Sequence, residues 1–449
     1  MANTFAHSQQ QLAELADSVI SQAIRAGASA AQVSFSESNG LLIEMRQGRL
    51  RARTRDAQSG LSLTVYRGQH QGTTSTTDFS PARLSETVQA ACRIAGYTGE
   101  DAYAGLPAAE FLCSSPRELD SWHPWALTEE DAQSLAQRLE HGIGSAGTGV
   151  VSDGVWVRSG QSQWYLMNSQ GFAQGDRQTH HVMSAKALAR KEGGSQLDFR
   201  YSQSPLASSL KAPEAIGLSA GRGALAALDV APLTGSRRCP VLFDPRSALS
   251  LLEHLIQAAG GAALYRQNSF LADRLEQRIF SEHIRIEEDP FVPQGLASRS
   301  FDGDGVSGAA RTVVDNGRLT GFFLSAYAAR RLGMAPTGNG SGPGNVSLRS
   351  ARTQPNDDFP AMVKKLHTGL LVTSFSGGGA RLINGDYSRS LRGFWVEAGE
   401  IRHAVDGVTI AGNLAEIFRS IVAVGADALT QGALTSGSVL IDSLQVAGR

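Results

Sequence analysis

Apolar residues recur along the chain at two spacings, one typical of helices and one of strands. Residues 8–26 carry apolar side chains every three or four positions and are closed by Gly27, which predicts a helix. In residues 246–260 the leucines share one face, so His254 is expected on the opposite face as a surface or interface histidine. The other predicted helices are residues 81–95, 128–142, 206–228, 325–332, 357–368 and 414–422.

Short apolar runs bounded by Gly, Asn and Ser predict strands. Ser38-Asn39-Gly40 indicates a turn between strands at 31–35 and 41–45, and Asp315-Asn316-Gly317 indicates a second hairpin turn. Residues 337–347, rich in Gly, Ser, Asn and Pro, predict a long loop. The other predicted strands are residues 61–66, 155–157, 163–167, 178–190, 241–243, 370–372, 394–397 and 408–410.

Chain length and element order predict an α+β fold in two domains. The 449 residues are more than one ordinary core holds. Residues 230–236 read as a connector, so we place an N-terminal α+β domain at 1–230 and a C-terminal β-rich domain at 238–449. Antiparallel strands with helices on one side are expected in the first domain.

Charge and composition exclude several classes of protein. The formal net charge of −1 gives no general attraction for nucleic acid or an anionic membrane. We find no run of about 18 apolar residues that could span a bilayer. The first eight residues lack the basic and apolar regions of a secretory signal. The three cysteines are few and widely spaced, which favours neither a disulfide framework nor a zinc knuckle. We therefore expect a cytoplasmic protein.

Several segments of the second half resemble the TldD/PmbA family of metallopeptidases, and more narrowly its PmbA (TldE) branch. They include residues 384–389, 393–397, 409–414 and 437–440, and the likeness is specific from about residue 240 onward. The resemblance implies a barrel-like or sandwich C-terminal domain that carries helices. It also implies proteolytic work on peptides, either leader removal during peptide maturation or degradation of small unfolded proteins.

The resemblance also implies where a catalytic metal would lie. In the catalytic branch a helix carries H-E-x-x-x-H, and a cysteine near the C-terminus is a further ligand. The matching positions here are Glu253, His254, Ala258 and Ser436. This set lacks the three ligands that a hydrolytic zinc needs. We therefore expect no metal in this chain, and zinc in a TldD-like partner subunit.

A glycine-rich patch and a polar cluster are the candidate peptide contacts. Gly377, Gly378 and Gly379 form either a mobile surface loop or a place where a peptide backbone approaches closely. Replacing Gly378 with Val is expected to weaken peptide processing and leave the fold intact. Asp386, Tyr387 and Arg389 form either a turn bonded to its own backbone or a wall of a peptide cleft.

These readings favour a non-catalytic subunit of a cytoplasmic metallopeptidase complex. The alternatives are a self-associating peptide-binding protein without peptidase activity, or a metallopeptidase in its own right with unusual ligands. The expected partners are a TldD-like subunit and a peptide or unfolded-protein substrate, with no nucleic acid and no membrane. Alone, the chain is expected to form a homodimer.

Overall fold

The computed structural model describes residues 5–192 and 194–448 of the chain. The fold is α+β, as predicted, with three six-stranded sheets in the described residues. No helix of this described part is long and apolar enough to cross a membrane. The division into domains 1–230 and 238–449 stays a prediction.

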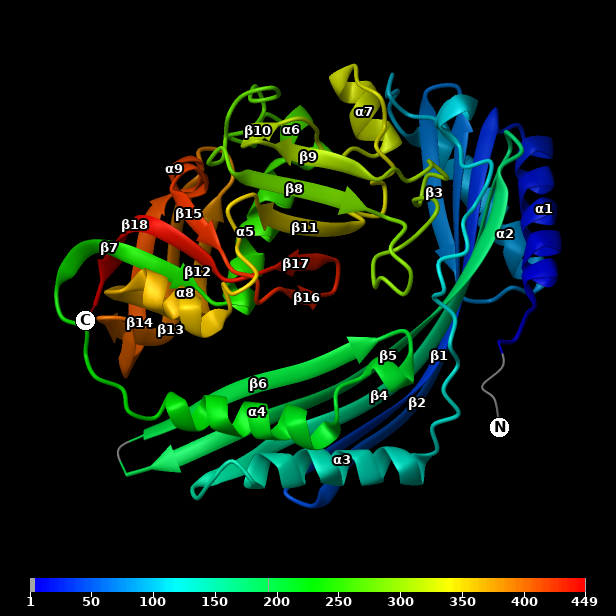
Figure 1. The fold of residues 1–449 in the computed structure, drawn as a ribbon. Helices are drawn as coiled ribbons and strands as arrows, with labels where there is room; N and C mark the ends of the chain where they lie inside the picture. Colours follow the sequence, from blue (N-terminus) through cyan, green and yellow to red (C-terminus); the bar gives the residue numbers. More distant parts are fainter. Residues whose placement is uncertain (1–4, 193, 449) are drawn as a thin grey trace.

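The first sheet is antiparallel and curves into a half-barrel (Figure 1). Its strands, in the spatial order β3-β2-β1-β4-β5-β6, are β1 (Ala30–Arg46), β2 (Arg49–Arg67), β3 (His70–Thr76), β4 (Val150–Asn168), β5 (Ala173–Lys191) and β6 (Gly194–Ser204). Its helices are α1 (Gln9–Arg25), α2 (Pro81–Tyr97), α3 (Glu129–Gly144) and α4 (Pro213–Ala226).

All four helices cover one face of this sheet, as predicted. Val33 and Phe35 of β1 pack with α1 and α2, whereas Leu41 and Ile43 pack in the cluster that holds α3 and α4. Since these β1 residues are spaced by even numbers, they point to the same face. The opposite, concave face turns toward the C-terminal half (Figure 1).

The hairpin predicted at Ser38-Asn39-Gly40 is wrong, because 30–46 form one continuous strand. Gly40 pairs with Gly160 of β4, and a Cβ on Gly40 would lie 2.9 Å from the Ser159 carbonyl oxygen. The glycine therefore serves close strand approach and not a turn. The separate strands at 155–157 and 163–167 are likewise one strand, β4. The actual turn after β1 lies at Gln47 and Gly48, both with positive φ.

A five-stranded closed barrel organises the C-terminal half, in agreement with the barrel-like form that the resemblance implied. The pairing of β14 with β18 closes the strand order β14-β13-β12-β7-β18, and β15 extends it. These strands are β7 (Ser236–Phe243), β12 (Gly369–Arg381), β13 (Asp386–Glu397), β14 (Glu400–Asn413), β15 (Ile421–Val424) and β18 (Val439–Ala447).

A smaller mixed sheet lies beside the barrel (Figure 1), and helices α5 to α9 complete the described part of this half. The sheet strands are β8 (Ile284–Asp289), β9 (Arg311–Asp315), β10 (Arg318–Leu319), β11 (Asn345–Ser350), β16 (Leu429–Gln431) and β17 (Leu434–Ser436). The helices are α5 (Pro245–Ala258), α6 (Gly261–Tyr265), α7 (Ala326–Leu332), α8 (Phe359–Leu366) and α9 (Leu414–Arg419).

The turn at Asn316 and Gly317 is confirmed, with positive φ at both residues. The loop predicted at 337–347 is shorter, since β11 begins at Asn345. The helix predicted to reach residue 422 ends at Arg419, because β15 takes Ile421–Val424 into the barrel sheet. Apolar residues after Arg419 therefore serve a strand, which the local spacing did not reveal.

Candidate functional site

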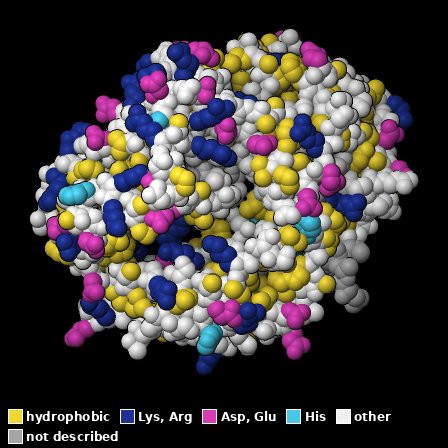
Figure 2. All heavy atoms as spheres, viewed as in Figure 1, with side chains coloured by type: hydrophobic (Ala, Val, Ile, Leu, Met, Phe, Trp, Pro, Cys, Tyr) yellow, Lys and Arg dark blue, Asp and Glu magenta, His cyan; other side chains and the backbone are white. Residues whose placement is uncertain are grey.

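A cleft of about 770 Å³ lies between the first sheet and the barrel. Its walls come from β5 and β6 on one side and from α5, β12 and β13 on the other. Figure 2 shows Lys and Arg side chains gathered around this hollow. The charged residues that line it are Lys186, Asp198, Arg246, Glu253, Arg389 and Arg392.

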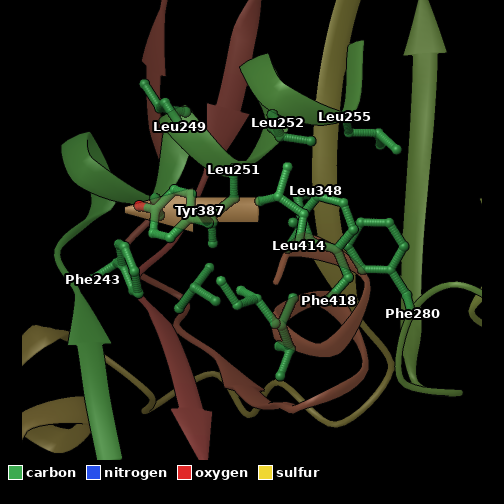
Figure 3. Packing of buried hydrophobic residues seen from close by; sticks show 14 of the residues in the cluster. Phe243, Leu249, Leu251, Leu252, Leu255, Phe280, Leu348, Tyr387, Leu414 and Phe418 are labelled. Atoms are coloured by element: carbon green, nitrogen blue, oxygen red, sulfur yellow. The ribbon is translucent and has the colours of Figure 1, made fainter. Parts of the chain in front are cut away.

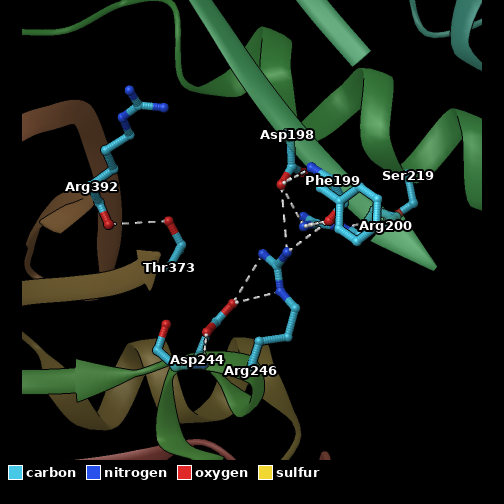
Figure 4. A network of polar contacts seen from close by, with 9 residues as sticks. Asp198, Phe199, Arg200, Ser219, Asp244, Arg246, Thr373 and Arg392 are labelled. Atoms are coloured by element: carbon cyan, nitrogen blue, oxygen red, sulfur yellow. Dashed lines mark hydrogen bonds and ion pairs between the residues drawn. The ribbon is translucent and has the colours of Figure 1, made fainter. Parts of the chain in front are cut away.

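An ion-pair bridge joins the two walls of the cleft (Figure 4). Arg246 of α5 lies 3.3 Å from the Asp244 carboxylate and 3.5 Å from that of Asp198 on β6. Arg200 of the same strand donates to Asp198 at 2.7 Å. The bridge therefore links the half-barrel sheet to the start of α5.

Asp244 begins α5 and also carries a buried charge. Its side chain accepts a hydrogen bond from the Ser247 backbone N–H at 2.8 Å, as an N-cap does. Burial raises the pKa of Asp244 to about 6. The N-cap of α5 is thus a buried carboxyl group, and burial disfavours its charged form.

His254 was expected at the surface or at an interface, and its burial rules out the surface. His254 is 7% exposed, and its ring packs edge-on against Tyr387 of β13 with 5.7 Å between centroids. α5 is buried around most of its circumference, since its leucines pack on the barrel core (Figure 3) and Ser250 and Ala258 are buried beside His254. Burial, reinforced by the charge of Arg389, lowers the pKa of His254 to about 4.

The positions that match the catalytic branch do not form a zinc ligand set. Glu253 is exposed in the cleft, whereas the His254 ring turns to Tyr387. Ala258 has no donor side-chain atom, and the Ser436 hydroxyl donates to the Gly437 carbonyl oxygen at 2.8 Å. Among the described residues we find no group of three His, Cys, Asp or Glu side chains that could hold a metal. The donor set at this helix therefore does not fit the metal that the family implies.

The glycine-rich patch is a strand and not a loop. Residues 377–379 of β12 pair with Ser390, Arg389 and Ser388 of β13 in turn. β7 pairs with β12 only at residues 370–372. From residue 373 to 381 the other edge of β12 has no strand neighbour in the described part of the chain.

The three glycines differ in what the fold demands of them. Gly378 has φ of +78°, and a Cβ there would lie 2.2 Å from the Ser388 carbonyl oxygen. A Cβ on Gly377 or Gly379 would have no atom within 4 Å. The expectation that Gly378→Val leaves the fold intact is therefore wrong, because valine clashes with β13 backbone and resists positive φ.

The polar cluster at 386–389 is the start of β13 and not a turn. Asp386 is exposed and accepts a hydrogen bond from the Asn384 side chain at 2.6 Å. Tyr387 lies in the barrel core, whereas Arg389 lines the cleft. The cluster is thus divided between the surface, the core and the cleft, and its role in peptide binding stays a prediction.

Sequence reasoning missed the bridge residues Asp198, Asp244 and Arg246. The Asp-Pro start of α5 is a local N-cap signal that could have identified Asp244. Asp198 carries no such signal, because it meets Arg246 only when β6 folds against α5. The distance between them in the sequence hides the contact.

Comparison with known proteins places nearly the whole chain in one family. Residues 236–448 match the PmbA/TldA metallopeptidase C-terminal domain. Residues 31–95 match domain 1 of the same family and residues 122–228 match its central domain. The C-terminal match covers the barrel, α5 and the smaller sheet.

Individual relatives agree with these matches. The chain is 35% identical to Metalloprotease PmbA of Escherichia coli O157:H7, over 98% of this chain and 97% of that protein. It is 30% identical to a PmbA homolog of Haemophilus influenzae, again over 98% and 97%.

Solved structures share the fold. One is a proposed modulator of DNA gyrase from Bacteroides thetaiotaomicron, with a TM-score of 0.91, 24% identity and coverage of 97% and 98% of the two chains. Another is TldE from Thermococcus kodakarensis, with a TM-score of 0.83, 19% identity and coverage of 97% and 100%. The chain therefore belongs to the PmbA/TldD metallopeptidase family, in its PmbA branch.

Proposed function

We propose that this chain is a non-catalytic, TldE-like subunit of a metallopeptidase complex. The observation that carries the proposal is the donor set on α5 and β17. By resemblance to the catalytic branch, Ala258 and Ser436 match two of the three ligand positions, and the Ser436 hydroxyl donates to the Gly437 carbonyl oxygen. A hydrolytic zinc needs about three protein ligands and an open position for water. A TldD-like partner would supply the zinc.

The role of the chain would be to hold an extended peptide in the cleft between the first sheet and the barrel. The free edge of β12 from residue 373 supports this role, because an extended chain can add to such an edge through backbone hydrogen bonds. Thr373 and Phe375 of this edge line the cleft. Gly377 and Gly379 extend the same edge without side chains, although the fold has room for a Cβ at both.

The substrate class would be peptides or small unfolded proteins, processed during peptide maturation or degradation in the cytoplasm. Sequence-tolerant backbone pairing suits such a range of substrates. Without its partner the chain would form a homodimer. A self-associating peptide-binding protein without a peptidase partner is the alternative outcome of the test.

The experiment compares the isolated chain with a reconstituted complex. Zinc content after dialysis and cleavage of an unstructured peptide are measured for the chain alone, for a TldD-like partner alone and for the mixture. We expect zinc to follow the partner, and chelator-sensitive cleavage to need the mixture. Stoichiometric zinc with chelator-sensitive cleavage by the isolated chain would overturn the proposal. Cleavage by the partner that this chain does not alter would favour the alternative.

A further inference from the structure

Arg389 differs from the other cationic residues of the cleft in its lack of an acidic partner. Arg246 pairs with Asp244 and Asp198, and Lys186 pairs with Asp153 at 2.7 Å. Likewise, Arg392 lies 3.2 Å from Asp406. For the Arg389 side chain, no ion pair or hydrogen bond is present among the described residues, and its Nε atom is buried without a partner.

Arg389 lies against the part of β12 that has one free edge. Its guanidinium stacks on the ring of Phe375 in β12, with 4.0 Å from Cζ to the ring centroid. Phe375 and Arg389 both line the cleft. A guanidinium that stacks through its face keeps its N–H donors directed to the sides, where a planar carboxylate can meet two of them.

The side chains beneath Arg389 do not neutralise its charge. His254 and Tyr387 are both buried there, and neither ring nitrogen of His254 nor the Tyr387 hydroxyl has a hydrogen-bond partner in the described chain. Because the pKa of His254 is lowered to about 4, its ring is neutral near pH 7. Glu253 lines the same cleft, but within the part of the chain that the structure describes no ion pair joins it to Arg389. A counter-charge would therefore have to enter from the cleft.

We propose that Arg389 is the centre of a carboxylate-binding site, and that its ligand is the carboxylate of a peptide extended along the free edge of β12. The inference rests on the proposed peptide-holding function and adds the chemistry that the site selects. The carboxylate could be the C-terminus of the peptide or the side chain of an Asp or Glu. Both sources offer the same planar group to the guanidinium.

Binding of labelled peptides to the purified full-length chain tests this site. Three peptides share one uncharged extended sequence and differ in their acid: a free C-terminus, a C-terminal amide, and an amide with one internal Glu. We expect the fully amidated peptide to bind about tenfold more weakly than a carboxylate peptide, as the loss of one charge-assisted pair implies. Comparison of the other two peptides distinguishes the two carboxylate sources.

Arg389→Gln should remove the preference for carboxylate peptides, and Arg389→Lys should weaken it but keep it. Arg402→Gln is the matched control, since Arg402 is an exposed arginine of β14 paired with Glu397. Thermal unfolding checks that each variant folds. If Arg389→Gln does not fold, the weaker carboxylate preference of Arg389→Lys still tests the site. Equal binding of acid and amide peptides, a preference that survives in Arg389→Gln, or no binding of any peptide at millimolar concentration would overturn the inference. Partner-dependent cleavage without a carboxylate preference would reject this site alone and leave the proposed function standing.

Discussion

At the scale of single residues, the site is built from polar groups that the fold buries. Asp244 caps α5 inside the bridge, and His254 and Tyr387 lie beneath the cleft without hydrogen-bond partners in the described chain. Burial disfavours the charged form of a carboxyl or an imidazole. Buried polar groups of this kind lower the unfolding free energy, so substitutions that remove them should raise it.

Asp244→Asn should change how stability depends on pH. The folded pKa of Asp244, about 6, lies above its ordinary value of 3.8, so the folded state favours the protonated carboxyl. The stability that the protonated Asp244 carboxyl allows is present below about pH 4, and it is lost as pH rises through 6. Wild type should therefore lose about 2 kcal/mol of unfolding free energy relative to Asp244→Asn between pH 4 and pH 7. Denaturant unfolding across this range measures the difference, and parallel curves would contradict the burial argument.

Tyr387→Phe should stabilise the protein. The Tyr387 hydroxyl is buried without a partner, and its removal relieves a desolvation cost of about 1 kcal/mol. Tyr327→Phe is the control, because the Tyr327 hydroxyl donates to Asp101 at 2.8 Å and its loss should cost about 1 kcal/mol. Unfolding free energies of both variants give the comparison. A loss of stability in Tyr387→Phe would show that the hydroxyl has a partner.

At the scale of elements, β12 performs two tasks along one strand. Its first half is a barrel strand between β7 and β13, and its second half keeps one edge free. A register shift between Val372 and Ser374 separates the halves, and a second shift follows between Phe375 and Gly377. Of the three glycines in the second half, Gly378 is required by its positive φ and by the nearby β13 backbone. Gly377 and Gly379 have room for a side chain.

Substitutions in β12 should separate these roles. Gly378→Val should lower the unfolding free energy by about 2 kcal/mol, because valine is strained at positive φ and meets the Ser388 carbonyl. Gly377→Val should leave stability nearly unchanged, because a Cβ there meets no atom within 4 Å. If the free edge holds peptide, only Gly377→Val gives a clean loss of peptide processing in the reconstituted complex. Full processing by a folded Gly377→Val variant would reject this peptide path.

At the scale of the whole molecule, the half-barrel sheet and the barrel face each other across the cleft (Figure 1). Within the described residues, the bridge of Asp198, Arg246 and Asp244 joins one wall to the other. The first sheet also has two edge strands, β3 and β6. Exposed strand edges favour association with another chain unless they are covered.

The isolated chain should therefore be a homodimer. Sedimentation equilibrium at micromolar concentration should give twice the mass of one chain. Addition of a TldD-like partner should replace the homodimer with a mixed complex, if the two chains use the same surface. A monomer at every concentration tested would contradict the prediction.

The sequence by itself determined the elements whose signals are local. The amphipathic helices and the Asn316-Gly317 turn follow from residues within a few positions of one another. Short motifs in the second half, such as residues 384–389 and 393–397, were enough to indicate the family. The sequence also shows that Ala258 offers no donor atom in any fold, whereas its match to a ligand histidine stays a prediction from the resemblance.

Only the tertiary structure decided the features that depend on distant segments. Gly40 reads locally as a turn residue, yet it allows β4 to approach β1. The helical spacing puts His254 on the polar face, but α5 is buried around most of its circumference and the His254 ring meets Tyr387. The bridge from Asp198 to Arg246 likewise joins the middle of β6 to the start of α5, 48 positions apart in the chain. Helical or strand periodicity predicts which residues share a face of an element. Which other element packs on that face depends on contacts between segments far apart in the sequence.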